Sequence, residues 1–370
     1  TPMELNGFES YTFFPGQHWS HTWERQHEII TRFAKYLYPQ IINICSPLGL
    51  LNHNPFNKSF WSRIRNYRKH QALSDSQNPM MDNMHFINAP HIPFHSKCIG
   101  LLNYNLMKSQ MGISENNFFW STYMNPTVYE FFRRSKFKVY DLAERRSTNP
   151  HLNKTILSWE NQAVREANVV FVDNHATYND YKDLNPNIYY IPQGVNCDSF
   201  YPIETPPEEK KYIGYIGNLH FAIDYDFLKA LITSNPEEQF LFIGGILENK
   251  GYEIINLPNV TYVNQIPKDE LNKYLAQMKV GLIPYIVNDH TVGVYPTKLF
   301  EYLSAGVPVI STPLPEVQQY ANDDYLKIID APTSINGFKF PMKETDKLVS
   351  NNTWDVRWSE YIKIIKSCLQ

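Results

Sequence analysis

Cysteine is scarce in this sequence. Four occur among 370 residues, far apart at Cys45, Cys98, Cys197 and Cys368. No two of them form a C-x-x-C pair, and no histidine stands at the spacing of a zinc ligand. The pattern therefore excludes a disulfide-stapled fold and a small zinc domain, and it suits a protein of a reducing cytoplasm.

Long apolar runs are also lacking. No stretch of about 18 apolar residues occurs, and the first residues show neither the basic flank nor the apolar core of an export signal. We therefore expect no membrane-spanning segment and a cytoplasmic location. The shares of hydrophobic residues, 43%, and charged residues, 19%, are ordinary for a globular protein and exclude a fibrous or disordered class.

Charge is unevenly divided along the chain. Residues 1–140 carry 14 Lys and Arg against 8 Asp and Glu, a balance of +6, so the net charge of −3 leaves −9 for the remainder. This asymmetry points the N-terminal part toward an anionic surface or substrate.

The length of 370 residues exceeds what one hydrophobic core usually serves, so two domains are favoured. Short β-rich runs alternate with helical patterns, clearly in the second half and less clearly in the first, which is typical of parallel α/β sheets. The stretch 192–211 is rich in proline and has the composition of a linker. We predict a Rossmann-like domain over 1–205 and a second over 206–352. The terminal helix, 353–370, is expected either to be a core helix or to pack back across the linker.

The predicted strands are 11–14, 41–45, 118–121, 138–140, 169–172, 188–191, 212–217, 240–244, 260–264, 280–284 and 307–311.

The most specific stretch is TVGVYPTKLFEYLSAGVPVIST, residues 291–312. Pro296 suits the first turn of a helix and Gly306 the position just past its end, so 296–305 is predicted as a helix. Its N-terminus would lie at the carboxyl edge of a parallel sheet, where α/β proteins bind anions. Lys298 opposes the helix dipole unless an anion is bound, so we expect a pyrophosphate there. A solvated ion pair between Lys298 and Glu301 is the alternative interpretation.

The pattern P-x-K-x-x-E-Y-L-x-x-G-x-P-V-I, from Pro296 to Ile310, resembles the donor-binding domain of family-4-like GT-B glycosyltransferases. The similarity is strongest to the teichuronic-acid and xanthan-type glucuronosyltransferase groups, with weaker similarity at 23–27 and 191–200. It implies two Rossmann-like domains facing each other across a cleft. It also implies a nucleoside diphosphate sugar, UDP-linked, as co-substrate and no further cofactor.

The resemblance also implies roles for particular residues. Glu301 would bind the donor ribose, Lys298 and the loop at Thr291 and Gly293 the diphosphate, and the backbone of Gln265 and Ile266 the base. The predicted donor site is completed by Pro296 and Thr297 at the helix start and by Gly217 and Asn218 after the first strand of the second domain.

Two positions depart from the family pattern. Many family-4 enzymes carry two glutamates separated by seven residues, and the earlier position here is Gly293. Many also place Arg and Lys after the first strand of this domain, where this chain has Gly217-Asn218-Leu219-His220. Lys298 is therefore expected to be the main phosphate cation, without a metal ion. Retention or inversion of the anomeric centre stays open.

An inverting transfer requires a general base within reach of the acceptor hydroxyl. Asp141 is the first candidate because it follows the predicted strand 138–140, and the resemblance at 139–141 points to the same residue. Glu144 is the second candidate. A helix cap is an equally good interpretation of Asp141. Gly16 and His18 are acceptor-side candidates in the turn that follows the first strand, although a lone histidine is more often structural.

The segment 60–70, from Phe60 to His70, combines aromatic and basic side chains. Nucleic-acid binders are usually basic throughout and carry a recognisable module, and neither feature is seen. We predict that this segment lies on anionic lipid at the inner face of the membrane and presents a lipid-linked acceptor. A merely solvated basic face is an equal alternative.

The leading hypothesis is transfer of a hexosyl or glucuronosyl group from a nucleoside diphosphate sugar to a carbohydrate or lipid-linked acceptor in cell-surface polysaccharide synthesis. A nucleotide-sugar epimerase of the same architecture is an alternative, distinguished by turnover of the donor without an acceptor. A non-catalytic two-lobed sugar-binding module is a third, and it would normally carry an export signal.

Overall fold

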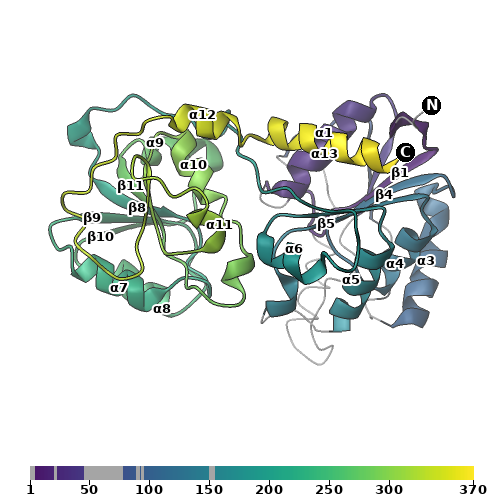
Figure 1. Ribbon diagram of the computed structural model, residues 1–370, viewed down its shortest axis with the longest axis horizontal. Helices are drawn as coiled ribbons and strands as arrows, with labels where there is room; N and C mark the ends of the chain where they lie inside the picture. Colours follow the sequence, from purple (N-terminus) through teal and green to yellow (C-terminus); the bar gives the residue numbers. More distant parts are fainter. Residues whose placement is uncertain (1–4, 21–22, 46–77, 89–91, 93–95, 150–154) are drawn as a thin grey trace. The chain divides into compact units, whose positions relative to one another are not determined.

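The computed structural model describes residues 5–20, 23–45, 78–88, 92, 96–149 and 155–370. The chain divides into two compact units (Figure 1). Unit 1 comprises Thr1–Ile191 and Trp358–Gln370, and unit 2 comprises Pro192–Arg357. Each unit is an α/β layer structure around one parallel sheet, which confirms the predicted fold class.

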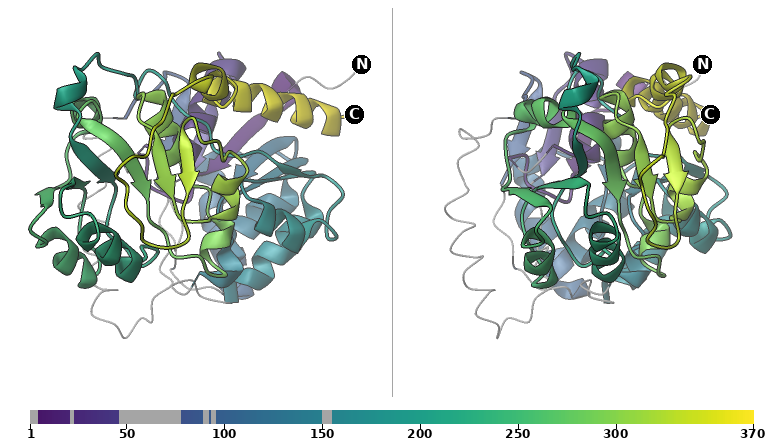
Figure 2. Two further views of the ribbon diagram at one scale, coloured as in Figure 1. Left: turned by 60° about the vertical axis from the view of Figure 1, so that its left-hand side comes forward. Right: turned by 90° about the vertical axis from the view of Figure 1, so that its left-hand side faces the viewer.

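Unit 1 contains a seven-stranded sheet in the order β3-β2-β1-β4-β5-β6-β7, and every pairing in it is parallel. Helices α1 and α13 lie on one face, and α3, α4, α5 and α6 lie on the other (Figures 1 and 2). The strands are β1 (Ser10–Phe14), β2 (Ile42–Cys45), β3 (Met84–Ile87), β4 (Asn117–Ser121), β5 (Phe137–Leu142), β6 (Val169–Val172) and β7 (Ile188–Tyr190). The helices are α1 (Arg25–Leu37), α3 (Lys97–Met111), α4 (Pro126–Arg134), α5 (Thr155–Glu166), α6 (His175–Tyr181) and α13 (Trp354–Cys368).

Unit 2 contains a six-stranded sheet in the order β10-β9-β8-β11-β12-β13, again with parallel pairing throughout. Helices α7 and α8 lie on one face, with α9, α10 and α12 on the other (Figure 1). The strands are β8 (Tyr212–Ile216), β9 (Gln239–Ile243), β10 (Val260–Val263), β11 (Met278–Ile283), β12 (Val309–Ser311) and β13 (Leu326–Ile328). The helices are α7 (Tyr225–Thr233), α8 (Lys250–Ile255), α9 (Leu271–Leu275), α10 (Lys298–Ser304), α11 (Pro315–Gln318) and α12 (Thr345–Ser350).

The central strands are apolar because helices cover both faces of each sheet. Strand β4, with the sequence NFFWS, is buried along its whole length. Asn125 and Asn174 begin α4 and α6 by accepting hydrogen bonds from the backbone N–H groups of Val128 and Thr177, as N-cap residues do. In the part of the chain that the structure describes, no helix is long and apolar enough to span a bilayer.

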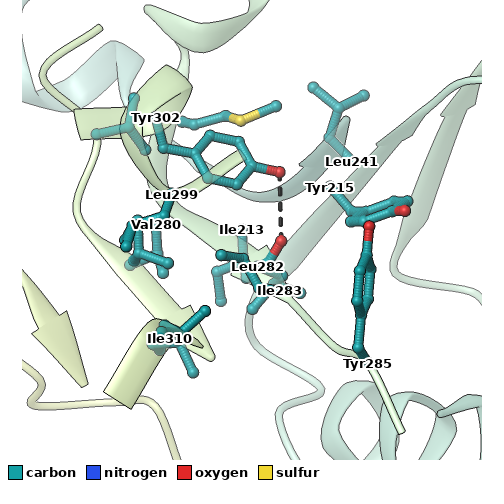
Figure 3. Close-up of a cluster of buried hydrophobic side chains, with 14 of the residues drawn as sticks. Ile213, Tyr215, Leu241, Val280, Leu282, Ile283, Tyr285, Leu299, Tyr302 and Ile310 are labelled. Atoms are coloured by element: carbon teal, nitrogen blue, oxygen red, sulfur yellow. Dashed lines mark hydrogen bonds between the residues drawn. The ribbon is translucent and has the colours of Figure 1, made fainter. Parts of the chain in front are cut away.

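The core of unit 2 includes a tyrosine that ties a helix to the sheet (Figure 3). Tyr302 of α10 donates to the carbonyl of Leu282 in β11 at 3.3 Å and accepts from the N–H of Ile216 in β8 at 3.0 Å. Its ring lies over Gly281, where a Cβ atom would meet ring carbons at 2.7 Å. These contacts fix α10 over the two central strands.

The division between the units lies at Ile191, earlier than the boundary near residue 205 that the composition indicates. The N–H of Val195 donates to the carbonyl of Asn352 at 3.0 Å, and the N–H of Trp354 donates to the carbonyl of Val195 at 3.2 Å. Phe200 packs into the core of unit 2. The stretch after residue 191 therefore belongs to unit 2, because its backbone and side chains are bonded there.

Helix α13 returns the chain to unit 1, as one of the two interpretations of the terminal helix expected. Residues from Trp358 onward belong to unit 1. The ring of Trp358 packs edge-on against Phe33 of α1, with centroids 4.8 Å apart, and also contacts Tyr36 at 6.0 Å.

Each predicted strand corresponds to an observed one within a few residues, but β3 and β13 were not predicted. β3 has only two of its four residues buried, and β13 has three residues in all. A histidine in β3 and a lysine in β13 also interrupt their apolar residues, so neither segment is recognisable as a strand by itself. Their sheet neighbours, not their sequences, make them strands.

Candidate functional site

The carboxyl edge of the sheet in unit 2 holds Lys298, at the first residue of α10. The helix runs over Lys298–Ser304 with Thr297 as its N-cap residue, so it begins two residues later than expected and Pro296 precedes it. Gly306 follows the end of the helix with φ +75°, as predicted for a C′ glycine. With only seven helical residues, the attraction of this site for an anion depends on the Lys298 side chain more than on a helix dipole.

The Lys298 side chain is half-buried and folds back over the end of β8. A Cβ atom on Gly217 would lie 2.6 Å from Lys298 Cε and 3.0 Å from its Nζ. The ammonium lies 5.6 Å from the centroid of the Tyr215 ring and 6.0 Å from that of Tyr285, within cation–π range. Burial by itself would lower the pKa of Lys298, but Tyr285 and Glu301 raise it above its ordinary value. The group is therefore a fixed cation at neutral pH.

Tyr215 and Tyr285, whose rings lie near this cation, are close to each other in the core of unit 2 (Figure 3). Tyr215 comes from β8 and Tyr285 follows β11. Burial, with Tyr285 and Tyr302 close by, raises the pKa of Tyr215 well above its ordinary value, so its hydroxyl is neutral at physiological pH.

Glycine is required where the loops after β8 and β9 meet. Gly217 and Gly244 both have φ +146°, a conformation that favours glycine. A Cβ atom on Gly244 would lie 2.2 Å from the Gly217 carbonyl oxygen. Asn218 stabilises this contact, because its side-chain oxygen accepts from the N–H of Gly245 at 2.8 Å. Gly217 and Asn218 therefore shape the edge on which Lys298 lies.

The loop at Thr291 and Gly293 differs from its expected role in phosphate binding. Thr291 is 1% exposed, and its hydroxyl donates to the carbonyl of Ile286 and accepts from the N–H of Asn288 at 3.0 Å. The N–H of Gly293 donates to the carbonyl of His290 at 3.0 Å. Since these groups are used inside the loop, they leave no donor for a diphosphate, and the loop serves to hold the segment that leads into α10.

The other predicted donor-site residues reach the same edge of the sheet. Glu301, half-buried on α10, lies close enough to Lys298 to act on its charge. Gln265 and Ile266 follow β10, the edge strand of the sheet, and Gln265 is exposed. The structure thus brings Lys298 and Glu301 close to Gly217, which follows β8. Gln265 and Ile266 follow β10, which lies two strands away from β8 in the sheet.

One residue beside Lys298 was missed by the sequence analysis. His220, in the loop between β8 and α7, lies edge-on to the Tyr285 ring with centroids 5.6 Å apart. Burial, together with Lys298 and His290, lowers the pKa of His220 to about 4. Its only sequence signal was its place in the stretch Gly217–His220, where the resemblance implies Arg and Lys.

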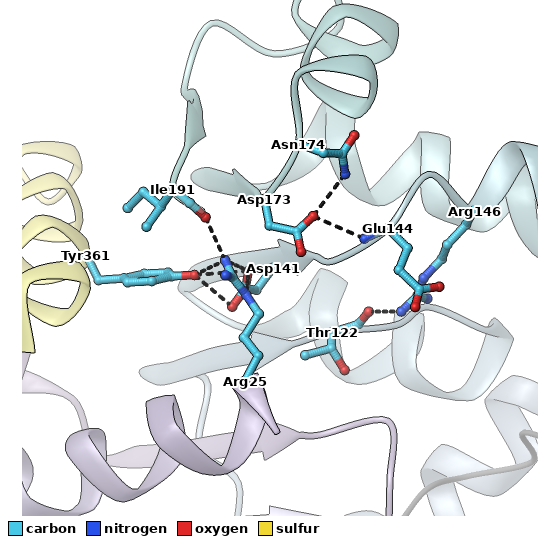
Figure 4. A network of polar contacts seen from close by, with 9 residues as sticks. All are labelled: Arg25, Thr122, Asp141, Glu144, Arg146, Asp173, Asn174, Ile191 and Tyr361. Atoms are coloured by element: carbon cyan, nitrogen blue, oxygen red, sulfur yellow. Dashed lines mark hydrogen bonds and ion pairs between the residues drawn. The ribbon is translucent and has the colours of Figure 1, made fainter. Parts of the chain in front are cut away.

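In unit 1, Asp141 lies inside β5, not after the strand as predicted, because β5 extends to Leu142. Its side chain is 0% exposed and forms an ion pair with Arg25 at 2.9 Å. Arg25 Nε donates to the same oxygen at 3.2 Å, and the hydroxyl of Tyr361 from α13 lies 3.2 Å from the other oxygen (Figure 4). Burial alone would lower the pKa of Arg25, but the charge of Asp141 raises it above its ordinary range. Asp141 is therefore enclosed in an ion pair, and neither a helix cap nor an open base describes its surroundings.

Glu144, the second candidate, lies in the loop after β5 and is exposed to solvent. It has φ +72°, a strained value for a residue other than glycine that is found preferentially at active sites. Its N–H donates to a carboxylate oxygen of Asp173 at 3.2 Å (Figure 4). Desolvation by the surrounding protein raises the pKa of Glu144, opposed by Arg146 and assisted by Asp173 and Glu24. An accessible carboxyl with a raised pKa is suited to general-base catalysis.

Gly16 and His18 follow β1 at the same edge of the sheet. Gly16 has φ +50°, and a Cβ atom there would lie 2.8 Å from Thr122 Oγ1, so glycine allows the two loops to approach. His18 Nδ1 lies 2.7 Å from Ser20 Oγ, a local contact that agrees with a structural role. The segment from Phe60 to His70, predicted to contact a membrane, lies outside the described residues.

The second unit is similar in sequence to known proteins. Residues 210–350 match the family "Glycosyl transferases group 1". A protein described as a teichuronic acid biosynthesis glycosyltransferase, TuaH of Bacillus subtilis (strain 168), is 28% identical over 142 residues, which is 36% of this chain and 36% of that protein. The matched segment thus spans about a third of the relative's length.

Solved structures extend the comparison to nearly the whole chain. A glycosyltransferase from Rickettsia africae ESF-5 superposes with a TM-score of 0.66 at 13% identity, covering 98% of this chain and 100% of that one. Anabaena Alr3699/HepE in complex with UDP gives a TM-score of 0.64 at 11% identity, covering 97% and 100%. A sucrose-phosphate synthase from Thermosynechococcus elongatus gives 0.61 at 14% identity, covering 98% and 94%. These structures show that the chain has the GT-B fold, within which residues 210–350 match the group 1 glycosyl transferase family.

Proposed function

We propose that this protein is a glycosyltransferase that moves a sugar from a nucleoside diphosphate sugar to a carbohydrate or lipid-linked acceptor in polysaccharide synthesis. The observation that carries the proposal is the Lys298 ammonium held over Gly217 at the carboxyl edge of a group 1 domain. Ligands of open α/β sheets bind at this edge. The structure of HepE with UDP and the description of TuaH support a UDP-linked donor and a cell-surface polymer.

On the donor side, Lys298 would neutralise the charge that develops on the leaving diphosphate. A preorganised cation in a partly desolvated site stabilises such charge more strongly than water does. Glu301, on the same helix, would accept hydrogen bonds from the ribose hydroxyls. The two residues therefore have separable roles, one toward phosphate and one toward the nucleoside.

On the acceptor side, a transfer with inversion requires a general base, and we assign that role to Glu144. The acceptor hydroxyl oxygen attacks the anomeric carbon, and the bond from that carbon to the diphosphate oxygen breaks. The nucleoside diphosphate leaves with the electron pair, and the hydroxyl proton passes to the Glu144 carboxylate. Asp141 is a weaker candidate because Arg25 and Tyr361 already occupy its oxygens.

The donor assignment predicts different effects of two substitutions on binding measured by calorimetry. Lys298→Ala should lower the affinity for UDP at least tenfold and leave that for uridine within twofold, because only UDP presents phosphate. Glu301→Ala should lower both affinities, since both ligands carry the ribose. The matched control is Lys279→Ala, at the amino end of β11, where the lysine pairs with Glu238. UDP affinities of both site variants within twofold of the wild type, about 0.4 kcal/mol, would contradict the assignment.

Turnover is expected to be independent of divalent metal ions. Lys298 already supplies positive charge beside the proposed diphosphate position. The initial rate of UDP release from the donor sugar should therefore be unchanged after treatment with EDTA and dialysis. A loss of rate that Mg²⁺ or Mn²⁺ restores would show that a metal ion carries this role.

A further inference from the structure

His220 occupies a loop whose geometry is fixed by backbone contacts. The carbonyl of His220 accepts from the hydroxyl of Tyr225 and from the N–H of Ile223, both at 3.1 Å. The preceding residue, Leu219, donates from its N–H to the carbonyl of Gly245 at 2.8 Å. The loop is therefore tied both to α7 and to the segment after β9.

The tautomer of His220 follows from its own hydrogen bond. The N–H of Ala222 lies 3.2 Å from His220 Nδ1, so Nδ1 must be an acceptor. The lowered pKa keeps the ring neutral at physiological pH, and a neutral imidazole with an accepting Nδ1 carries its proton on Nε2. Among the residues that the structure describes, none is hydrogen-bonded to Nε2. His220 thus has one N–H donor available for a ligand.

The His220 ring and the Lys298 cation lie beside the same tyrosine. Both groups lie against the Tyr285 ring: the imidazole centroid at 5.6 Å and the ammonium at 6.0 Å from the ring centroid. After burial, Lys298 is the largest cause that lowers the pKa of His220, because a positive charge close by disfavours a second one. A ligand oxygen bound by Lys298 would therefore lie in the neighbourhood of the His220 ring.

The chemistry of the ligand requires more than one partner. A diphosphate carries at least two negative charges and many acceptor oxygens, while the stretch Gly217–His220 contains no Arg or Lys. We propose that His220 donates a hydrogen bond from Nε2 to the diphosphate of the sugar donor, next to Lys298. The inference rests on the proposed function and adds a phosphate ligand to the donor site. Hydrogen bonds to charged groups are stronger than neutral ones, so a clear effect on affinity is expected.

The test compares three His220 variants by calorimetric titration with UDP and with uridine. His220→Leu keeps much of the side-chain volume but removes the donor, and His220→Ala removes the ring altogether. Both should lower the affinity for UDP about tenfold and leave that for uridine within twofold. His220→Gln retains an N–H donor and should recover most of the UDP affinity. His85→Leu serves as the matched control, because His85 is an exposed histidine of β3 in the other unit, and thermal unfolding of each variant checks its fold.

The outcomes separate this inference from the proposed function. If the wild type binds UDP and all three His220 variants bind it equally well, His220 is not a phosphate ligand, although the donor site stands. If His220→Leu and His220→Ala lose UDP and uridine affinity equally, the ring supports the loop and the inference fails. If His220→Leu retains UDP affinity while His220→Gln loses it, shape and not hydrogen bonding is required, and the inference fails again. Failure of the wild type itself to bind UDP would overturn the proposed function together with this inference.

Discussion

Replacing Glu144 by Gln is expected to lower kcat about a hundredfold or more while leaving the affinity for UDP within twofold. General-base catalysis contributes factors of about 10² to 10⁴, and Gln cannot accept the proton of the acceptor hydroxyl. The measurement is the initial rate of UDP release at saturating donor and acceptor, with UDP binding measured separately. Glu115→Gln is the matched control, because Glu115 is an exposed glutamate of unit 1.

The pH dependence provides a second measure of the same role. Because desolvation raises the pKa of Glu144, its carboxylate is protonated at a higher pH than that of an ordinary glutamate. The kcat of the wild type should therefore fall on the acid side, with a midpoint above the usual carboxyl range. Glu144→Gln should have a low rate without this acid limb. A variant that keeps the wild-type rate and pH profile would remove Glu144 from the mechanism.

The second large effect is expected on stability. Asp141→Ala should lower the free energy of unfolding by about 3–5 kcal/mol, because it leaves the buried Arg25 guanidinium without its carboxylate. Tyr361→Phe, which removes the hydroxyl that accepts from Arg25 and donates to Asp141, should lower it by about 1.5–3 kcal/mol, as expected for hydrogen bonds to charged groups. Urea unfolding followed by circular dichroism measures both changes.

This prediction distinguishes the two carboxylates of β5 and its loop. If Asp141 is structural, the specific activity of Asp141→Asn should fall only with the folded fraction of the protein. A stable, fully folded Asp141→Asn protein with kcat lowered a hundredfold would instead make Asp141 the base. Arg25 and Tyr361 would then have to move away from its oxygens during the reaction.

Much of the fold was predictable from the sequence because parallel strands covered on both faces are nearly continuous apolar runs. The runs at β6 and β9 are examples, and both are found where they were predicted. The end of β5 was not predictable in the same way. Asp141 is a charged residue inside a strand, and it is tolerated there only because Arg25, 116 residues away in the sequence, pairs with it.

On the donor side, too, the sequence predicted some features of the site and not others. The local pattern around Lys298 and Glu301 placed both residues at the carboxyl edge of a sheet, and the structure brings them there. The pattern also suggested a phosphate role for Thr291, whose hydroxyl is in fact bonded to the carbonyl of Ile286. Sequence spacing gives the proximity of a hydroxyl to a site, but not whether the backbone has already used it.

The sequence by itself determined two parallel α/β domains, a terminal helix and the segment that carries the donor-site lysine and glutamate. These features depend on periodicity, glycine and proline positions and a local motif, all of which act over a few residues. The tertiary structure alone decided that the Asp141 carboxylate is buried in an ion pair while Glu144 is exposed to solvent. It also decided that His220 and Lys298 lie against the same tyrosine ring. Burial, pKa and the availability of a hydrogen bond depend on groups that the fold brings together from distant parts of the chain, and for that reason no local pattern contains them.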